Sequence, residues 1–131
     1  MTAQPSPSKP RILVIDDEPL IADALRRVLR RKHDVTVANT GTEAAQLLDT
    51  QQSFDAIICD MFMPDMSGME LHERLSQSAP EVARRMLFTS GGAYTEQAQQ
   101  FLNTMPDRFI QKPFDILKLS KRIAEFIESL K

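Results

Sequence analysis

Four groups of chemically capable side chains lie along the sequence, each directly after a short apolar run. They are Asp16-Asp17-Glu18, Asp60, Thr89-Ser90-Gly91 and Lys112-Pro113. Three close carboxylates repel one another unless a cation lies among them. Oxygen ligands without cysteine or histidine suit a hard divalent ion, and Mg²⁺ is its natural identity. An ammonium and a hydroxyl facing that ion would bind a tetrahedral anion, and a carboxylate there could attack phosphorus.

The runs that precede these groups predict strands. Arg11–Asp16 and Phe54–Asp60 are continuous apolar segments that end in an acid, a pattern typical of strands buried on both faces. Three further strands are predicted over Asp34–Ala38, Arg85–Thr89 and Arg108–Gln111. Helical spacing of apolar residues predicts five helices between and after the strands: from Pro19, from Thr40-Gly41, from Gly68, over Tyr94–Asn103 and from Ile116 to Leu130.

Alternating strands and helices predict an α/β fold with a parallel sheet and helices on both faces. In such a sheet the binding site lies at the carboxyl ends of the strands. The four groups should therefore meet along one edge of the sheet.

Composition limits the class of protein. The chain has 131 residues, is 42% hydrophobic and carries a net charge of -2, which suits one folded domain and argues against direct nucleic-acid binding. Its apolar runs are too short to insert into a membrane, and no apolar stretch follows Met1. A single cysteine, Cys59, fits a reducing compartment, so we expect a cytoplasmic protein. Residues 1–9 are rich in Pro and Ser and predict a flexible arm before a domain over 10–131.

The motifs resemble those of a known family. VIDDEP (Val14–Pro19), DMFMPDMSG (Asp60–Gly68), FTSGG (Phe88–Gly92) and QKPF (Gln111–Phe114) each close an expected strand, in this order. Together they resemble the receiver domain of two-component response regulators, the family that includes the bacterial chemotaxis response regulator. The resemblance implies a flavodoxin-like, doubly wound sheet with strand order 2-1-3-4-5.

The resemblance also implies roles for the acidic residues. Asp60 would be the phosphoacceptor, which takes a phosphoryl group from a phosphohistidine to form an acyl phosphate. Asp17 and Asp60 would contact Mg²⁺ directly, together with the main-chain carbonyl of Phe62. Asp16 would act on the ion mostly through water. Catalysis would be confined to the protein's own phosphorylation and dephosphorylation.

The remaining site residues follow from the same resemblance. Lys112 would pair with phosphoryl oxygens, and Pro113 would follow a cis peptide bond. We expect the switch hydroxyl to be that of Ser90, because a small residue follows it; Thr89 is the second choice. Phe109 would be the aromatic side chain that turns inward when the hydroxyl moves.

Partners are implied at the level of class. A sensor histidine kinase or a histidine phosphotransfer protein would donate the phosphoryl group, docking near Pro19, Leu20, Asp23 and Pro113. A downstream protein would then recognise the face made by the fourth helix, fifth strand and fifth helix of the family fold. The sequence leaves open the cognate donor, the target, phosphorylation-dependent dimerisation, and whether the receiver is free-standing or part of a longer regulator.

The same residues also allow simpler, structural interpretations. Asp16 and Asp17 could cap a helix, Lys112 could be a solvated lysine and Ser90 could belong to a turn. A phosphohydrolase with an aspartyl-phosphate intermediate is the alternative function, but such enzymes usually carry a second acid where this chain has Phe62. We also interpret Cys59 and four methionines as packing residues: Met61, Met63, Met66 and Met69.

Overall fold

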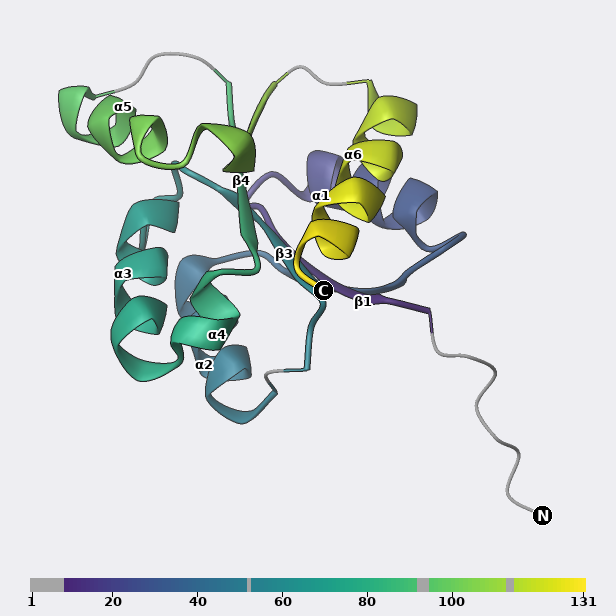
Figure 1. Ribbon diagram of the computed structural model, residues 1–131, viewed down its shortest axis with the longest axis horizontal. Helices are drawn as coiled ribbons and strands as arrows, with labels where there is room; N and C mark the ends of the chain where they lie inside the picture. The colour runs from purple at the N-terminus through teal and green to yellow at the C-terminus, as the bar shows by residue number, and fades with distance from the viewer. Residues whose placement is uncertain (1–8, 52, 92–94, 113–114) are drawn as a thin grey trace.

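A five-stranded parallel sheet forms the centre of the molecule, with helices on both faces (Figure 1). This computed structural model describes residues 9–51, 53–91, 95–112 and 115–131. The strand order is β2-β1-β3-β4-β5, so the predicted doubly wound topology is confirmed. The strands are β1 (Arg11–Ile15), β2 (Asp34–Ala38), β3 (Ala56–Asp60), β4 (Met86–Ser90) and β5 (Phe109–Gln111).

The helices begin where the sequence supplies caps. Thr40, Ser67, Thr95 and Asp115 each accept a backbone N–H of the helix that follows, while α1 begins with a proline whose missing N–H needs no partner. The helices are α1 (Pro19–Leu29), α2 (Gly41–Thr50), α3 (Gly68–Ser78), α4 (Pro80–Ala83), α5 (Glu96–Asn103) and α6 (Ile116–Ser129), with a 3₁₀ turn at Pro106–Arg108.

Several predicted boundaries differ from the observed ones. The short α4 was not predicted; Pro80 in its first turn starts it directly after α3. The strand predicted over Arg85–Thr89 lies one residue later and includes Ser90. The last strand is shorter than predicted because a 3₁₀ turn occupies Arg108. The predicted helix over Tyr94–Asn103 begins at Glu96, and Tyr94 lies outside the described residues.

Two hydrophobic clusters fill the space between sheet and helices. Alternate strand residues face opposite sides of the sheet, so Leu13 and Ile15 contribute to one cluster, and Ile12 and Val14 to the other. Helices α2, α3, α4 and α5 cover the first cluster, and α1 and α6 cover the second (Figure 1). All five residues of β1's neighbour β3 are buried, as its continuous apolar run predicted.

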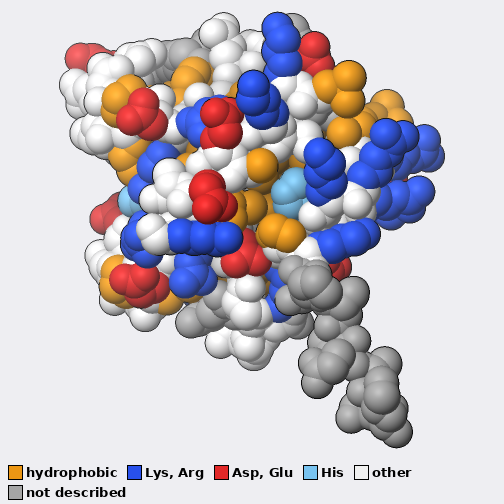
Figure 2. All heavy atoms as spheres, turned by 45° about the vertical axis from the view of Figure 1, so that its right-hand side comes forward, with side chains coloured by type: hydrophobic (Ala, Val, Ile, Leu, Met, Phe, Trp, Pro, Cys, Tyr) orange, Lys and Arg blue, Asp and Glu red, His pale blue; other side chains and the backbone are white. Residues whose placement is uncertain are grey.

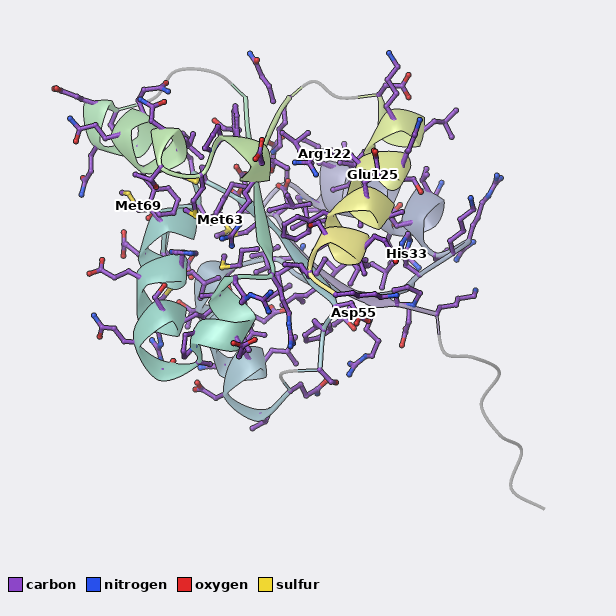
Figure 3. All side chains as sticks on the ribbon, in the orientation of Figure 1. His33, Asp55, Met63, Met69, Arg122 and Glu125 are labelled. Carbon is purple, nitrogen blue, oxygen red and sulfur yellow. The ribbon has the colours of Figure 1, made fainter. Side chains whose placement is uncertain are left out.

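The residues interpreted as packing groups do pack. Cys59 is buried with a free thiol. Met61 and Met63 are buried, and Met66 and Met69 are partly buried against the first cluster. Figure 3 shows Met63 and Met69 on the α3 side of the sheet, opposite Arg122 and Glu125 on α6.

The surface over α1 and α6 carries many basic side chains (Figure 2). Arg26 and Arg27 lie in the last turn of α1, where positive charge is favourable against the negative end of the helix dipole. Both pair with Asp23, at 3.0 Å in each case. None of the described helices is long and apolar enough to cross a lipid bilayer.

The predicted arm lies mostly outside the described residues, which begin at Lys9. The Lys9 ammonium donates a hydrogen bond to the main-chain oxygen of Arg30, and the Pro10 oxygen accepts one from the Asp34 N–H. The domain boundary at residues 9 and 10 therefore stays a prediction.

Candidate phosphoacceptor and metal site

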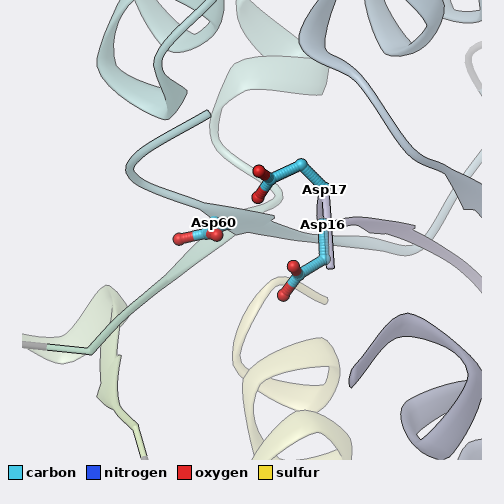
Figure 4. A group of neighbouring side chains, drawn as sticks. All are labelled: Asp16, Asp17 and Asp60. Atoms are coloured by element: carbon cyan, nitrogen blue, oxygen red, sulfur yellow. The ribbon is translucent and has the colours of Figure 1, made fainter. Parts of the chain in front are cut away.

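Three carboxylates converge at the carboxyl edge of the central strands. Asp16 and Asp17 follow β1, and Asp60 ends β3. Each offers an oxygen, and these atoms all lie within 4.8 Å of one another (Figure 4). They meet because β1 and β3 are hydrogen-bonded neighbours, with Ile15 opposite Cys59. Asp16 and Asp60 are buried, whereas Asp17 is half-buried.

The Lys112 ammonium enters this group from the end of β5. Its Nζ lies 3.0 Å from Asp16 Oδ2, 3.4 Å from Asp60 Oδ2 and 3.9 Å from Glu18 Oε1. The side chain is only 12% exposed. The Lys112 N–H also donates to the Ser90 oxygen at 2.7 Å, which continues the β4–β5 pairing by one residue. The ammonium is thus held facing the acidic edge.

Burial and charge compete in setting the pKa values here. Burial raises the pKa of Asp60 above its ordinary value, and the charge of Asp16 adds to this rise, while Lys112 partly opposes it. Burial alone would lower the pKa of Lys112, but the hydrogen bond and charge of Asp16, with Asp60, outweigh burial and raise it. The lysine is therefore charged at neutral pH, and negative charge at Asp60 is incompletely compensated by the protein.

The donor set fits a hard divalent cation. Among the described residues, the three clustered carboxylates and that of Glu18 outnumber the one ammonium, and the cluster contains only oxygen ligands. The main chain already orients two of them: Asp16 Oδ1 accepts from the Glu18 N–H at 2.9 Å, and Asp60 Oδ1 from the Phe62 N–H at 3.3 Å. A cation among these groups would balance the excess negative charge.

The two candidate switch hydroxyls occupy different surroundings. Ser90 is fully buried, and its Oγ has no hydrogen-bond partner among the described residues. Thr89 is also buried and lies directly opposite Asp60 in the β3–β4 pairing. Alternation along β4 places Ser90 on the side of Phe88 and Thr89 on the side of Leu87. The unpartnered buried hydroxyl favours Ser90, whose switch role stays a prediction.

Two aromatic side chains, Phe62 and Phe109, belong to the segments that follow Asp60 and precede Lys112. Phe62, two residues after Asp60, is 40% exposed. Phe109 is partly buried against the first cluster and lies opposite Phe88 in the β4–β5 pairing. Pro113, for which a cis peptide was expected, lies outside the described residues.

The sequence predicted no role for Asp65 and only a surface or structural role for His72, and the structure makes both residues prominent. Asp65, within the DMFMPDMSG motif, accepts two N–H groups from the start of α2, 24 and 23 residues away in sequence. His72 packs edge-on against the rings of Phe88 and Phe101. An acid in a loop signals a capping group, but only tertiary contact reveals which helix it caps.

The sequence is similar to that of known response regulators. The family model for the response regulator receiver domain matches residues 12–124. The response regulator protein PilR of Pseudomonas aeruginosa is 34% identical over 118 residues, which are 89% of this chain and 26% of PilR. The transcriptional regulatory protein SpaR of Bacillus subtilis is 34% identical over 114 residues, 86% of this chain and 50% of SpaR. The chain thus spans a quarter to a half of these relatives.

Solved structures agree with the fold. A CheY-like response regulator receiver domain protein from Methanospirillum hungatei JF-1 superposes with a TM-score of 0.82 at 28% identity, over 94% of this chain and 97% of that one. The receiver domain of the Francisella response regulator 1452 gives a TM-score of 0.78 at 29% identity, over 93% and 99%.

Proposed function

Because the chain belongs to the response regulator receiver family, we propose that it is a phosphoacceptor module in which Asp60 takes a phosphoryl group from a phosphohistidine. The donor would be a sensor histidine kinase or a histidine phosphotransfer protein. The observation that carries this proposal is the pairing of a buried acid with a partly buried ammonium: Lys112 Nζ lies 3.4 Å from Asp60 Oδ2, beside a cluster of three carboxylates.

The reaction proposed is a transfer at phosphorus. A lone pair of an Asp60 carboxylate oxygen forms the new O–P bond, and the P–N bond of the phosphohistidine breaks. The electron pair of that bond stays on the imidazole nitrogen, which takes up a proton. Lys112, already held at the acidic edge, pairs with phosphoryl oxygens and stabilises the charge that spreads over them.

Magnesium is the proposed cofactor. Asp17, Asp60 and the main-chain carbonyl of Phe62 would hold it directly, and Asp16 would do so through water. When bound, the ion neutralises charge on the carboxylates and on the incoming phosphoryl oxygens. The support is the all-oxygen donor set and its excess negative charge.

The output proposed is a change on the face formed by α5, β5 and α6. Ser90 would rotate its hydroxyl to a phosphoryl oxygen, and Phe109 would move inward. Two observations support this pair: the Ser90 Oγ has no partner, and Phe109 is only partly buried beside Phe88. A downstream protein would recognise the altered face.

Donor docking is proposed at the start of α1. Leu20, in the first turn of α1 and three residues after Asp17, is 86% exposed and would offer a donor protein an apolar contact. Pro19, Asp23 and the segment after Lys112 would flank it. The proposed location is the cytoplasm, where a free thiol such as that of Cys59 persists.

The test is chemical phosphorylation. The protein is incubated with phosphoramidate and MgCl₂, and the intact mass is measured; we expect one added phosphoryl group. Asp60→Asn should abolish the addition, whereas Asp49→Asn, which changes an exposed acid on α2, should not. Labelling that persists in Asp60→Asn would place the acceptor elsewhere, and omission of MgCl₂ without effect would remove the ion from the proposal.

A further inference from the structure

We propose that Asp65 is a positioning residue for this site, which fastens the loop between β3 and α3 to the start of α2 and thereby fixes the Phe62 carbonyl for metal binding. The inference rests on the proposed function and assigns a role to a residue outside the acidic cluster. We call residues 61–67 the acceptor loop, because they follow the proposed phosphoacceptor.

The fastening consists of two hydrogen bonds to one carboxylate. The Gly41 N–H donates to Asp65 Oδ1 at 3.1 Å, and the Thr42 N–H donates to Oδ2 at 2.7 Å. Both are among the first N–H groups of α2, which have no partner within the helix. The Thr42 hydroxyl and backbone, with Gly41, lower the pKa of Asp65 to about 2, so the carboxylate stays ionised and anchored near neutral pH.

Close backbone packing also holds the acceptor loop, against α2 at Gly41 and against the end of β3 at Gly68. A Cβ on Gly41 would lie 2.7 Å from Met66 Cβ and 2.8 Å from the Met66 oxygen. A Cβ on Gly68 would lie 2.8 Å from the Asp60 oxygen. Neither contact is tolerated by a larger residue without movement, so glycine at both positions lets the acceptor loop lie directly against α2 and against the end of β3.

The loop is also closed at its base. The Gly68 N–H donates to the Met61 oxygen at 3.0 Å, and the Met61 N–H donates to the Thr89 oxygen at 2.9 Å. Phe62 therefore lies between a fixed base and the Asp65 anchor three residues later. Release of Asp65 would leave the hydrogen bonds at the base intact. The outer part of the acceptor loop would then be able to move, so the direction of the Phe62 carbonyl would no longer be fixed.

Asp65 caps the Gly41 and Thr42 N–H groups, and this capping of α2 can be separated from its hold on the acceptor loop. The α2 helix already has a cap of its own, because Thr40 Oγ1 accepts the Glu43 N–H at 3.0 Å. Thr40→Ala and Asp65→Ala both weaken the same helix end, but only the second detaches the acceptor loop. Comparison of these two variants therefore separates a loss of α2 stability from a change at the metal site.

The experiment compares wild type with Asp65→Ala, Asp65→Asn and Thr40→Ala. Binding of MgCl₂ is followed by isothermal titration calorimetry and by amide chemical shifts of residues 60–62, and the phosphorylation rate with phosphoramidate is measured against MgCl₂ concentration. Asp65→Ala should weaken magnesium binding about tenfold, a typical effect of removing an outer-shell partner. Its rate at saturating MgCl₂ should stay close to wild type. Asp65→Asn, which keeps one acceptor oxygen, should recover part of the affinity.

Thr40→Ala should lower the melting temperature as Asp65→Ala does, with wild-type magnesium affinity. Wild-type affinity in folded Asp65→Ala, or equal loss in Thr40→Ala, would overturn the positioning role and leave the proposed function standing. Failure of the wild type itself to bind magnesium would remove the ion from the proposed function and overturn the positioning role with it, whereas the phosphoacceptor role is tested separately by Asp60→Asn.

Discussion

The acceptor loop and the end of β4 both adjoin Asp60 and are built in opposite ways. The acceptor loop is tied at its base by Gly68 and Met61 and at its tip by Asp65. The end of β4 instead buries the Ser90 hydroxyl without a partner. The acceptor loop is thus fixed before any ligand arrives, whereas the end of β4 contains a polar group whose hydrogen bonding is incomplete.

The unpartnered Ser90 hydroxyl suggests how phosphorylation would shift the balance between two conformations. A buried polar group without a partner costs about 1–3 kcal/mol. A phosphoryl oxygen on Asp60 would offer Ser90 an acceptor, so phosphorylation would relieve that cost at the end of β4 without rearranging the acceptor loop. The ligand then favours the second state by a differential contact, which is the requirement for shifting an equilibrium.

The largest effect is expected from removal of Lys112, which extends the pairing of β5 with the end of β4. We expect Lys112→Ala to slow phosphorylation by phosphoramidate about a hundredfold, because a preorganised charge aimed at the developing phosphoryl oxygens is lost. Lys118→Ala, which changes an exposed lysine on α6, is the matched control. A rate within threefold of wild type for Lys112→Ala would contradict the role given to the ammonium.

Removal of the unpartnered Ser90 hydroxyl should stabilise the unphosphorylated protein and so test the difference between the acceptor loop and the end of β4. Ser90→Ala should raise the free energy of unfolding of the unphosphorylated protein by about 1 kcal/mol, since a buried oxygen without a partner disappears. Urea unfolding gives the value. Thr89→Val is the neighbouring control, because no unpartnered atom is found at Thr89, and it should not stabilise the chain. Stabilisation by Thr89→Val alone would make Thr89 the better switch candidate.

The raised pKa of Asp60 predicts a pH-dependent stability difference. Burial raises this pKa above its ordinary 3.8, so the folded chain binds this proton more tightly than the unfolded chain. Without Mg²⁺, Asp60→Asn should be more stable than wild type at pH 7, and the gap should shrink as pH falls through the raised pKa towards 3.8. Thermal melts in EDTA measure it. A gap that widens on acidification would reverse the sign and contradict this account.

The smallest effect is expected at Phe62. Its ring is 40% exposed beside Asp60 and would shield an acyl phosphate from water. Phe62→Asn should shorten the lifetime of the phosphorylated protein by a few-fold, as measured by phosphate release. Leu117→Asn is a control at another exposed apolar side chain, on α6. Unchanged decay in Phe62→Asn would show that the ring has no part in the lifetime.

Much of the fold followed from local patterns. The apolar run that ends at Asp60 predicted a buried strand, and the structure has one there, because a strand covered on both faces needs apolar residues throughout. The start of α1 at Pro19 followed from the preference of proline for the first turn. Boundaries near α4 and β5 were missed, since short turns depend on neighbouring elements more than on local preference.

The sequence by itself determined which residue types end each strand, and strand order brings those ends together. Hence the acids at 16, 17 and 60 and the amine at 112 were foreseeable as one group. Tertiary structure alone decided which hydroxyl lacks a partner and which helix receives the Asp65 carboxylate. The reason is distance along the sequence. The residue types that end a strand can be recognised from their immediate neighbours, whereas burial and hydrogen-bond partners depend on segments more than twenty residues away.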